Sequence, residues 1–135
     1  MRKLLLALCM LVSFTSVALA ITGGVSGTQV TVSYQEPTTN EVDYLGNTTT
    51  LDDLHATSIY YQMPGSTTPV VALVVLSTST TGGASISKAI TVPSQNKRRV
   101  AYTFWATATD TSGNESIASP TFSVIIDKLA PAPPK

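Results

Sequence analysis

The feature that most constrains this chain is the absence of a helical period after Ala20. Beyond that point apolar residues either alternate with polar ones or form short runs, and Gly, Pro, Asn, Asp and Ser separate the runs. Alternation with period two is typical of half-buried β-strands, whereas an amphipathic helix repeats its apolar positions about every 3.6 residues. The sequence therefore predicts an all-β fold.

Turn residues divide this part of the chain into short strands. Residues 21–27, weakened by glycines, would form a short first strand, and the clearest strand is 100–109. Six to seven antiparallel strands at this spacing are typical of a β-sandwich. The remaining predicted strands are 29–34, 56–62, 70–76, 84–92 and 121–126.

The first twenty residues have the order of a secretory signal peptide. Arg2 and Lys3 precede the apolar run 4–19, and the small residues Ala18 and Ala20 flank Leu19. This order predicts a signal peptide 1–20 that is cleaved after Ala20, with no stable membrane insertion afterwards. We expect a secreted, periplasmic or cell-surface protein, with one domain over 21–126 and a proline-rich tail over 127–135.

Cysteine and charge exclude several functions for the exported chain. Its only cysteine, Cys9, lies in the signal segment, so the exported chain would lack disulfides, thiolate nucleophiles and thiolate metal sites. Loss of Arg2 and Lys3 leaves six basic residues against eight acidic ones, a net charge of −2. Nucleic-acid binding needs a basic stripe, and we expect none.

Strand parity predicts which side chains face the core. Lys88 falls on the inward parity of its strand, which a bulge or a position at the rim would explain. The same parity leaves Trp105 facing outward, because Phe104 faces inward. The expected inward residues are Val30, Val32, Tyr34, Thr57, Ile59, Tyr61, Ile86, Ile90, Tyr102, Phe104, Ala106, Ala108, Phe122, Val124 and Ile126.

Catalytic and metal-binding patterns are absent from the sequence. The single histidine, His55, lies beside Asp52 and Asp53, but no nucleophile motif frames any serine. Residues 110–115 lack the ordered carboxylate spacing of a calcium loop and have the composition of a tight turn. We therefore expect no enzyme activity, no metal and no cofactor.

Three stretches of the chain resemble the fibronectin type III family. They are Val30 to Pro37, Leu51 to Tyr61 and Tyr102 to Ser116, in the family's order. The resemblance implies an immunoglobulin-like sandwich in which the Tyr102 hydroxyl bonds back to the upstream backbone. It also implies that the loops 36–55 and 110–115 lie at one end.

Those loops would gather seven of the eight acids at one end, with Lys97, Arg98 and Arg99 at the other. An acidic tip would attract cations or basic partners. Trp105 and Tyr60 would form an outward aromatic patch, which either grips a ligand or only stabilises the sheet. The candidate partner-binding residues are Trp105, Tyr60, Asp52, Asp53, Asp110, Asn114 and Glu115.

The resemblance and these surfaces predict a non-catalytic binding or adhesion module for a protein or carbohydrate ligand. The alternative is a structural subunit or accessory protein of a cell-surface or virion assembly. Its basis is the predicted edge strand 70–76, which is apolar on both faces. Such a strand aggregates unless it is covered or pairs with another chain, and self-association through 70–76 is one way to pair it.

Overall fold

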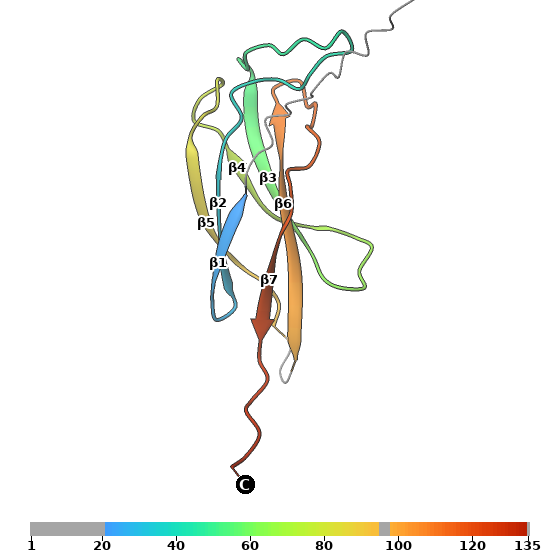
Figure 1. Ribbon diagram of the computed structural model, residues 1–135. Helices are drawn as coiled ribbons and strands as arrows, with labels where there is room; N and C mark the ends of the chain where they lie inside the picture. Colours follow the sequence, from blue (N-terminus) through green and yellow to red (C-terminus); the bar gives the residue numbers. More distant parts are fainter. Residues whose placement is uncertain (1–20, 95–97, 135) are drawn as a thin grey trace, which may run out of the picture.

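The protein is a sandwich of two antiparallel sheets, as the computed structural model shows in Figure 1. The structure describes residues 21–94 and 98–134, so the predicted signal peptide and Lys97 lie outside the described residues. Within those ranges no helix is long and apolar enough to cross a membrane. The predicted all-β sandwich is confirmed.

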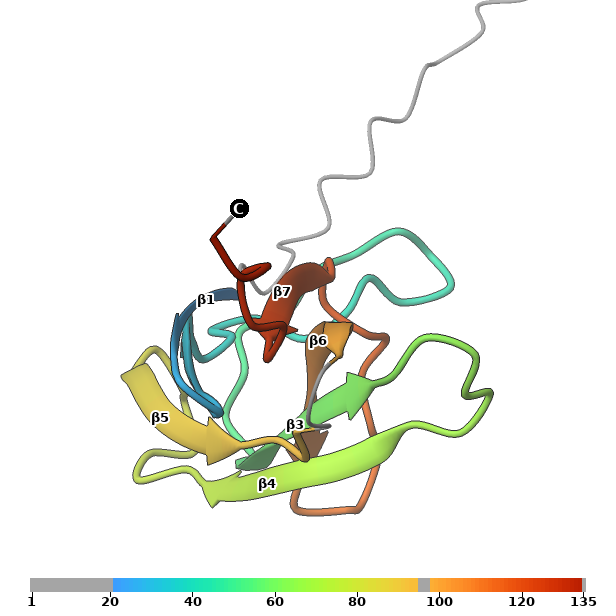
Figure 2. The same ribbon diagram turned by 90° about the horizontal axis from the view of Figure 1, so that it is seen from below.

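In the described part of the chain seven strands build the two layers, which Figure 2 shows in a view along the strands. One sheet has the order β1-β2-β5, and the other has the order β4-β3-β6-β7. The strands are β1 (Thr22–Ser26), β2 (Gln29–Gln35), β3 (Leu54–Gln62), β4 (Val70–Leu76), β5 (Ser85–Thr91), β6 (Arg99–Asp110) and β7 (Phe122–Asp127).

The core between the sheets follows the predicted parity. Phe104 and Tyr102 are fully buried in the middle strand β6, and the Phe104 ring stacks on Phe122 with centroids 5.2 Å apart. Of the expected inward residues, Ile86, Ala108 and Phe122 are only partly buried. Burial of the remaining aromatic and aliphatic side chains supplies most of the stabilisation of a domain without disulfides.

Two hydroxyl groups in the core have hydrogen-bond partners. The Tyr102 hydroxyl donates to the backbone carbonyl oxygen of Pro93, which is the upstream bond that the resemblance implies. Thr57, a polar residue on the inward face, is fully buried and its hydroxyl bonds to that of Tyr34. The Tyr34 bond satisfies the hydroxyl of Thr57, so this position avoids the cost of an unpaired buried polar group.

One side of the sandwich is closed and the other is open. On the closed side β1 packs beside β7, so tightly that a Cβ on Gly23 would lie 2.4 Å from the Phe122 ring. On the other side β4 and β5 are the last strands of their sheets, and Figure 2 shows them as neighbours. The predicted position of strand 70–76 at an edge is therefore confirmed.

Lys88 is accommodated by its place at the open edge. It stands opposite Val32 in an unbroken β2–β5 register, so no bulge moves it off the inward face. Its side chain is nevertheless exposed, because β5 has no neighbour on its outer side. Of the two explanations that the sequence left open, the position at the rim is the one observed.

Candidate functional site

The long polar loop between β2 and β3 folds into a hairpin-like arm over residues 38–50. Thr39 and Thr50 form an isolated bridge, and the Asn40 amide donates to the Thr49 carbonyl at 2.9 Å. At the base, the Leu51 amide donates to the Thr38 carbonyl at 3.0 Å, and the Leu51 side chain is buried. The arm is therefore a fixed element, where the sequence indicated only a loop.

A second segment, residues 115–119, covers the upper half of β6. The pairing between β7 and β6 ends at Phe122 and Phe104. The β6 residues that follow Phe104 therefore have no neighbouring strand on that side. Ser119 supplies the missing hydrogen bonds. Its amide donates to the Ala106 carbonyl at 2.9 Å, and its hydroxyl accepts from the Ala106 amide at 3.0 Å. Ser116 makes the same two contacts with Ala108.

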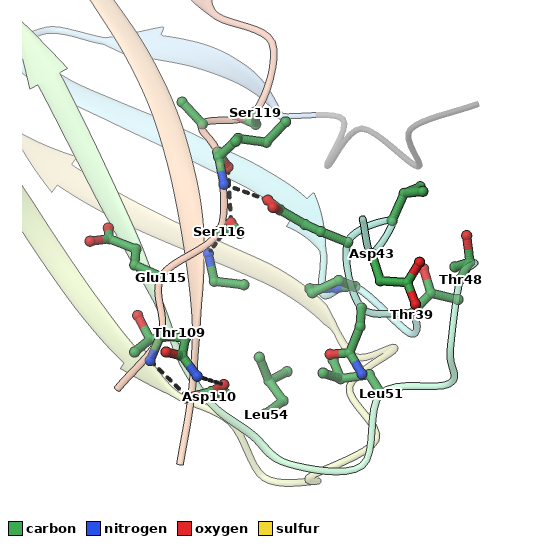
Figure 3. Close-up of a pocket in the computed structure, with 18 of the residues that line it drawn as sticks. Thr39, Asp43, Thr48, Leu51, Leu54, Thr109, Asp110, Glu115, Ser116 and Ser119 are labelled. Atoms are coloured by element: carbon green, nitrogen blue, oxygen red, sulfur yellow. Dashed lines mark hydrogen bonds between the residues drawn. The ribbon is translucent and has the colours of Figure 1, made fainter. Parts of the chain in front are cut away.

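A cavity of about 710 Å³ lies between the arm and this segment (Figure 3). Figure 3 shows Leu54 between Asp110 and Leu51. Glu41 on the arm accepts a hydrogen bond from the Ile117 amide at 2.5 Å, which ties the two walls together. The lining residues are Pro37, Thr39, Asn40, Glu41, Val42, Asp43, Thr48, Leu51, Leu54, Ala108, Thr109, Asp110, Asn114, Glu115, Ser116, Ile117, Ala118, Ser119 and Pro120.

The two walls carry the same turn, Asp-x-x-Gly-Asn, at 43–47 and 110–114. Asp43 Oδ1 accepts from the amides of Leu45 and Asn47 at 2.8 Å. In the second turn Asp110 Oδ1 accepts from the amides of Ser112 and Asn114, also at 2.8 Å. The glycines have φ of 84° and 86°, a conformation that favours glycine. These carboxylates therefore hold their own loops rigid.

Hydrogen bonding lowers the pKa of three carboxyl groups at this end. The backbone amide of Asn47 is the main cause for Asp43, and the side chain of Asn114 is the main cause for Asp110. For Glu115 the pKa is lowered first by the hydroxyl of Thr107 and then by that of Tyr60. All three groups are therefore ionised at neutral pH, and the cavity has a negative rim.

Tyr60 and Trp105 form an aromatic pair on the outer face of the larger sheet. They stand directly opposite each other on β3 and β6, with ring centroids 5.8 Å apart and planes at 8°. The Tyr60 hydroxyl donates to Glu115 Oε1 at 2.8 Å, and Thr107 donates to the same oxygen at 2.6 Å. Because Glu115 also lines the cavity, it connects the aromatic pair with the cavity.

The predicted site residues fall into two groups. Asp110, Asn114 and Glu115 line the cavity, and Tyr60 and Trp105 lie beside it through Glu115. The two others lie outside the lining. Asp52 is exposed, and Asp53 is half-buried, with Oδ1 lacking a hydrogen-bond partner among the described residues.

One acid expected at the exposed tip is instead buried. Glu36 is 2% exposed, and its Oε2 accepts from the Ala84 amide at 3.3 Å. It therefore adds no charge to the surface of the tip. His55 is exposed at the beginning of β3. Among the described residues, no three His, Cys, Asp or Glu side chains come together as metal ligands.

Comparisons with protein-family models, with curated proteins and with solved structures found no match. The fibronectin type III resemblance thus remains a prediction from the residues. Ile117 was not singled out by sequence reasoning, and Glu41 and Asp43 were expected at this end only as part of the acidic tip, not among the candidate binding residues. The repeated Asp-x-x-Gly-Asn pattern was the available signal, since it marks Asp43 as the counterpart of Asp110.

The two aspartate turns predict a loss of order in acid. A carboxyl group whose pKa is lowered by folding stabilises the fold above its ordinary pKa of about 4, and this contribution is lost as pH falls through the lower folded value. We therefore expect the amide signals of residues 43–47 and 110–114 to shift together below about pH 4. NMR titration of the backbone amides measures this. Ordinary carboxyl titration in both turns would contradict the assignment.

Proposed function

We infer that the chain is an exported, non-catalytic binding module that holds a protein or carbohydrate ligand at its loop end. The observation that carries this proposal is the cavity between the arm and residues 115–120. Its volume of about 710 Å³ falls within the usual range for ligand pockets, which is about 300–1,000 Å³. Its walls are fixed by backbone hydrogen bonds, so little conformational entropy would be lost on binding.

The chemistry of the lining suits a ligand with an apolar body and polar or cationic groups. Val42, Ile117 and Pro120 supply accessible apolar surface, while Glu41 and Glu115 supply charge at the rim. Each glutamate uses one carboxylate oxygen within the protein and has a second oxygen to offer. The aromatic pair extends this surface toward the middle of the sheet. Aromatic rings beside polar groups are common in protein and sugar recognition.

Binding is tested with the purified product of the full chain on arrays of glycans and of short peptides. Ala118→Arg would fill the cavity, and we expect it to reduce binding to any captured probe at least about tenfold. The matched control is Leu129→Arg, because Leu129 is exposed on the tail at the opposite end. Equal binding by both variants would exclude the cavity as the site. Mass spectrometry of the same product shows whether cleavage follows Ala20.

The role of the aromatic pair is tested separately with Trp105→Ala. If the pair contacts the ligand, we expect affinity to fall by about 1–2 kcal/mol while the unfolding free energy changes little. If the pair only stabilises the sheet, stability falls and affinity is unchanged. Titration of a captured probe and urea unfolding of the same variant separate the two roles.

A second candidate is a structural subunit or accessory protein of a cell-surface or virion assembly. The observation that favours it is the exposure of β4, an apolar strand at the open edge of its sheet. Val70, Val71, Val74 and Leu76 are 40–65% exposed. An edge of this kind is normally covered or paired, because its free backbone groups recruit further strands.

A further inference from the structure

We propose that two copies of this chain pair through their β4 strands, running antiparallel, to form one continuous eight-stranded sheet. The proposal rests on the second candidate function and names the partner as a second copy. It is independent of what the cavity binds. Four observations carry it: the state of the other edges, the surface beside β4, the charges at the two ends, and the residues that β4 would pair with in a second copy.

The edge strands of the two sheets differ in whether they carry a feature that discourages pairing with a further strand. β5 carries Lys88 exposed on its inward face, and an inward-pointing charge of this kind discourages a further strand. β4 has neither a charge nor a proline, and residues 54–87 contain no Asp, Glu, Lys or Arg. On the closed side β1 and β7 also end their sheets, but they pack against each other, with Gly23 close to the Phe122 ring, which leaves little room for a further strand. Of these positions, only the β4 edge lacks a feature that would prevent pairing.

The surface beside β4 is apolar beyond the strand itself. Val71 stands opposite Tyr60, and Tyr60 stands opposite Trp105, so aliphatic and aromatic side chains form one row across the outer face. A bulge in β4 between these positions and Leu73 places Val71 on this face. Val74 lies on the same face, opposite Ser58, and is 53% exposed. A β4 strand from a second copy would continue this row beside Val71 and Val74, and it would leave Trp105, which is two strands away, accessible to a ligand.

The charges select a second copy and its direction. Glu41, Asp43 and Asp52 are exposed at the loop end. At the opposite end, where the tail leaves in Figure 1, the exposed basic residues Arg98, Arg99 and Lys128 outnumber Asp127, which lies 3.8 Å from Arg99. Antiparallel pairing sets the acidic end of each copy beside the basic end of the other, which is attractive. Parallel pairing would place like charges together. A two-fold arrangement also closes on itself and stops at two copies.

The uncharged strand β4 can pair in an antiparallel sense with β4 of a second copy. With Leu73 on the two-fold axis and the bulge at Ala72 taken into account, Val71 of one copy faces Val74 of the other on the outer face. Val70 then faces Val75 on the inner face. Every cross-strand pair is then aliphatic, without a buried polar or charged side chain. A partner of either charge would gain nothing from β4 itself.

Sedimentation of the purified product of the full chain tests the pairing. We expect a dimer at about 100 µM and weakening in high salt, which screens the end charges. Val74→Lys should raise the dimer Kd at least about tenfold, because it places two like charges in the interface. The matched control is Ile125→Lys on the outer face of the same sheet, where Ile125 is 46% exposed on β7. Leu76→Lys replaces Val74→Lys if that variant melts early.

Several results would overturn the proposal. A monomeric wild type would refute the dimer, while array binding at the loop end would be unaffected. Equal weakening by Val74→Lys and Ile125→Lys would also refute pairing at β4. Direction is tested in a Cys9→Ser background by mixing Val71→Cys with Val74→Cys, which face each other only in the antiparallel pair. Antiparallel strands give disulfides that join one variant to the other. Disulfides that join two copies of the same variant would overturn the proposed direction.

Discussion

Replacing Phe104 with alanine is expected to lower the free energy of unfolding by about 3–5 kcal/mol. Phe104 is fully buried in β6, and its ring contacts Phe122 at 5.2 Å and Tyr61 at 5.9 Å between centroids. Its removal therefore leaves a cavity in the centre of the sandwich, and the contacts to both neighbouring rings are lost. Because small domains are stable by only about 5–15 kcal/mol, the variant would be close to unfolding. Urea unfolding measures the change.

The control for Phe104→Ala is Trp105→Ala, one residue along the same strand. Trp105 lies on the outer face and is half-buried against Tyr60, so its loss opens no internal cavity. Comparing the two losses of unfolding free energy tests the strand parity of β6 directly. A shift of one residue would place Trp105 on the inner face and Phe104 on the outer face. A larger loss of stability for Trp105→Ala than for Phe104→Ala would show that the parity is wrong.

Replacing Gly82 with alanine is expected to cost about 2–5 kcal/mol of unfolding free energy. Gly82 has φ of +65°, a conformation that costs other residues about 1–2 kcal/mol. In addition, a Cβ at this position would lie 1.9 Å from the carbonyl oxygen of Pro37, so the backbone must move. Overpacking of this kind adds about 1–3 kcal/mol. Thermal and urea unfolding both report the loss.

The matched control for Gly82→Ala is Gly113→Ala. Gly113 has φ of +86°, but a Cβ there would meet nothing within 4 Å. It therefore carries only the conformational cost of about 1–2 kcal/mol. Because Pro37 is where the arm leaves β2, Gly82→Ala should also weaken capture of any probe bound in the cavity. Equal destabilisation by the two variants would argue against close packing of Gly82 on Pro37.

The candidate site was only partly accessible from the sequence. Trp105 and Tyr60 could be placed on the outer face from parity, and Asp110, Asn114 and Glu115 could be placed in a turn. Their relation to the arm could not, because Glu41 meets the Ile117 amide across 76 residues of chain. The burial of Glu36 was also hidden, since it depends on the loop that follows β4, where the Ala84 amide contacts Oε2.

The sequence by itself determined the strands, their inward faces and the turns between them. Those properties are local, since period-two alternation and turn residues act over a few positions. Tertiary structure decided how segments far apart complete one another. Ser116 and Ser119 pair with β6 in place of a strand, the arm closes a cavity against them, and β4 is left at an open edge. Such contacts depend on the packing of whole sheets, which no short stretch of sequence encodes.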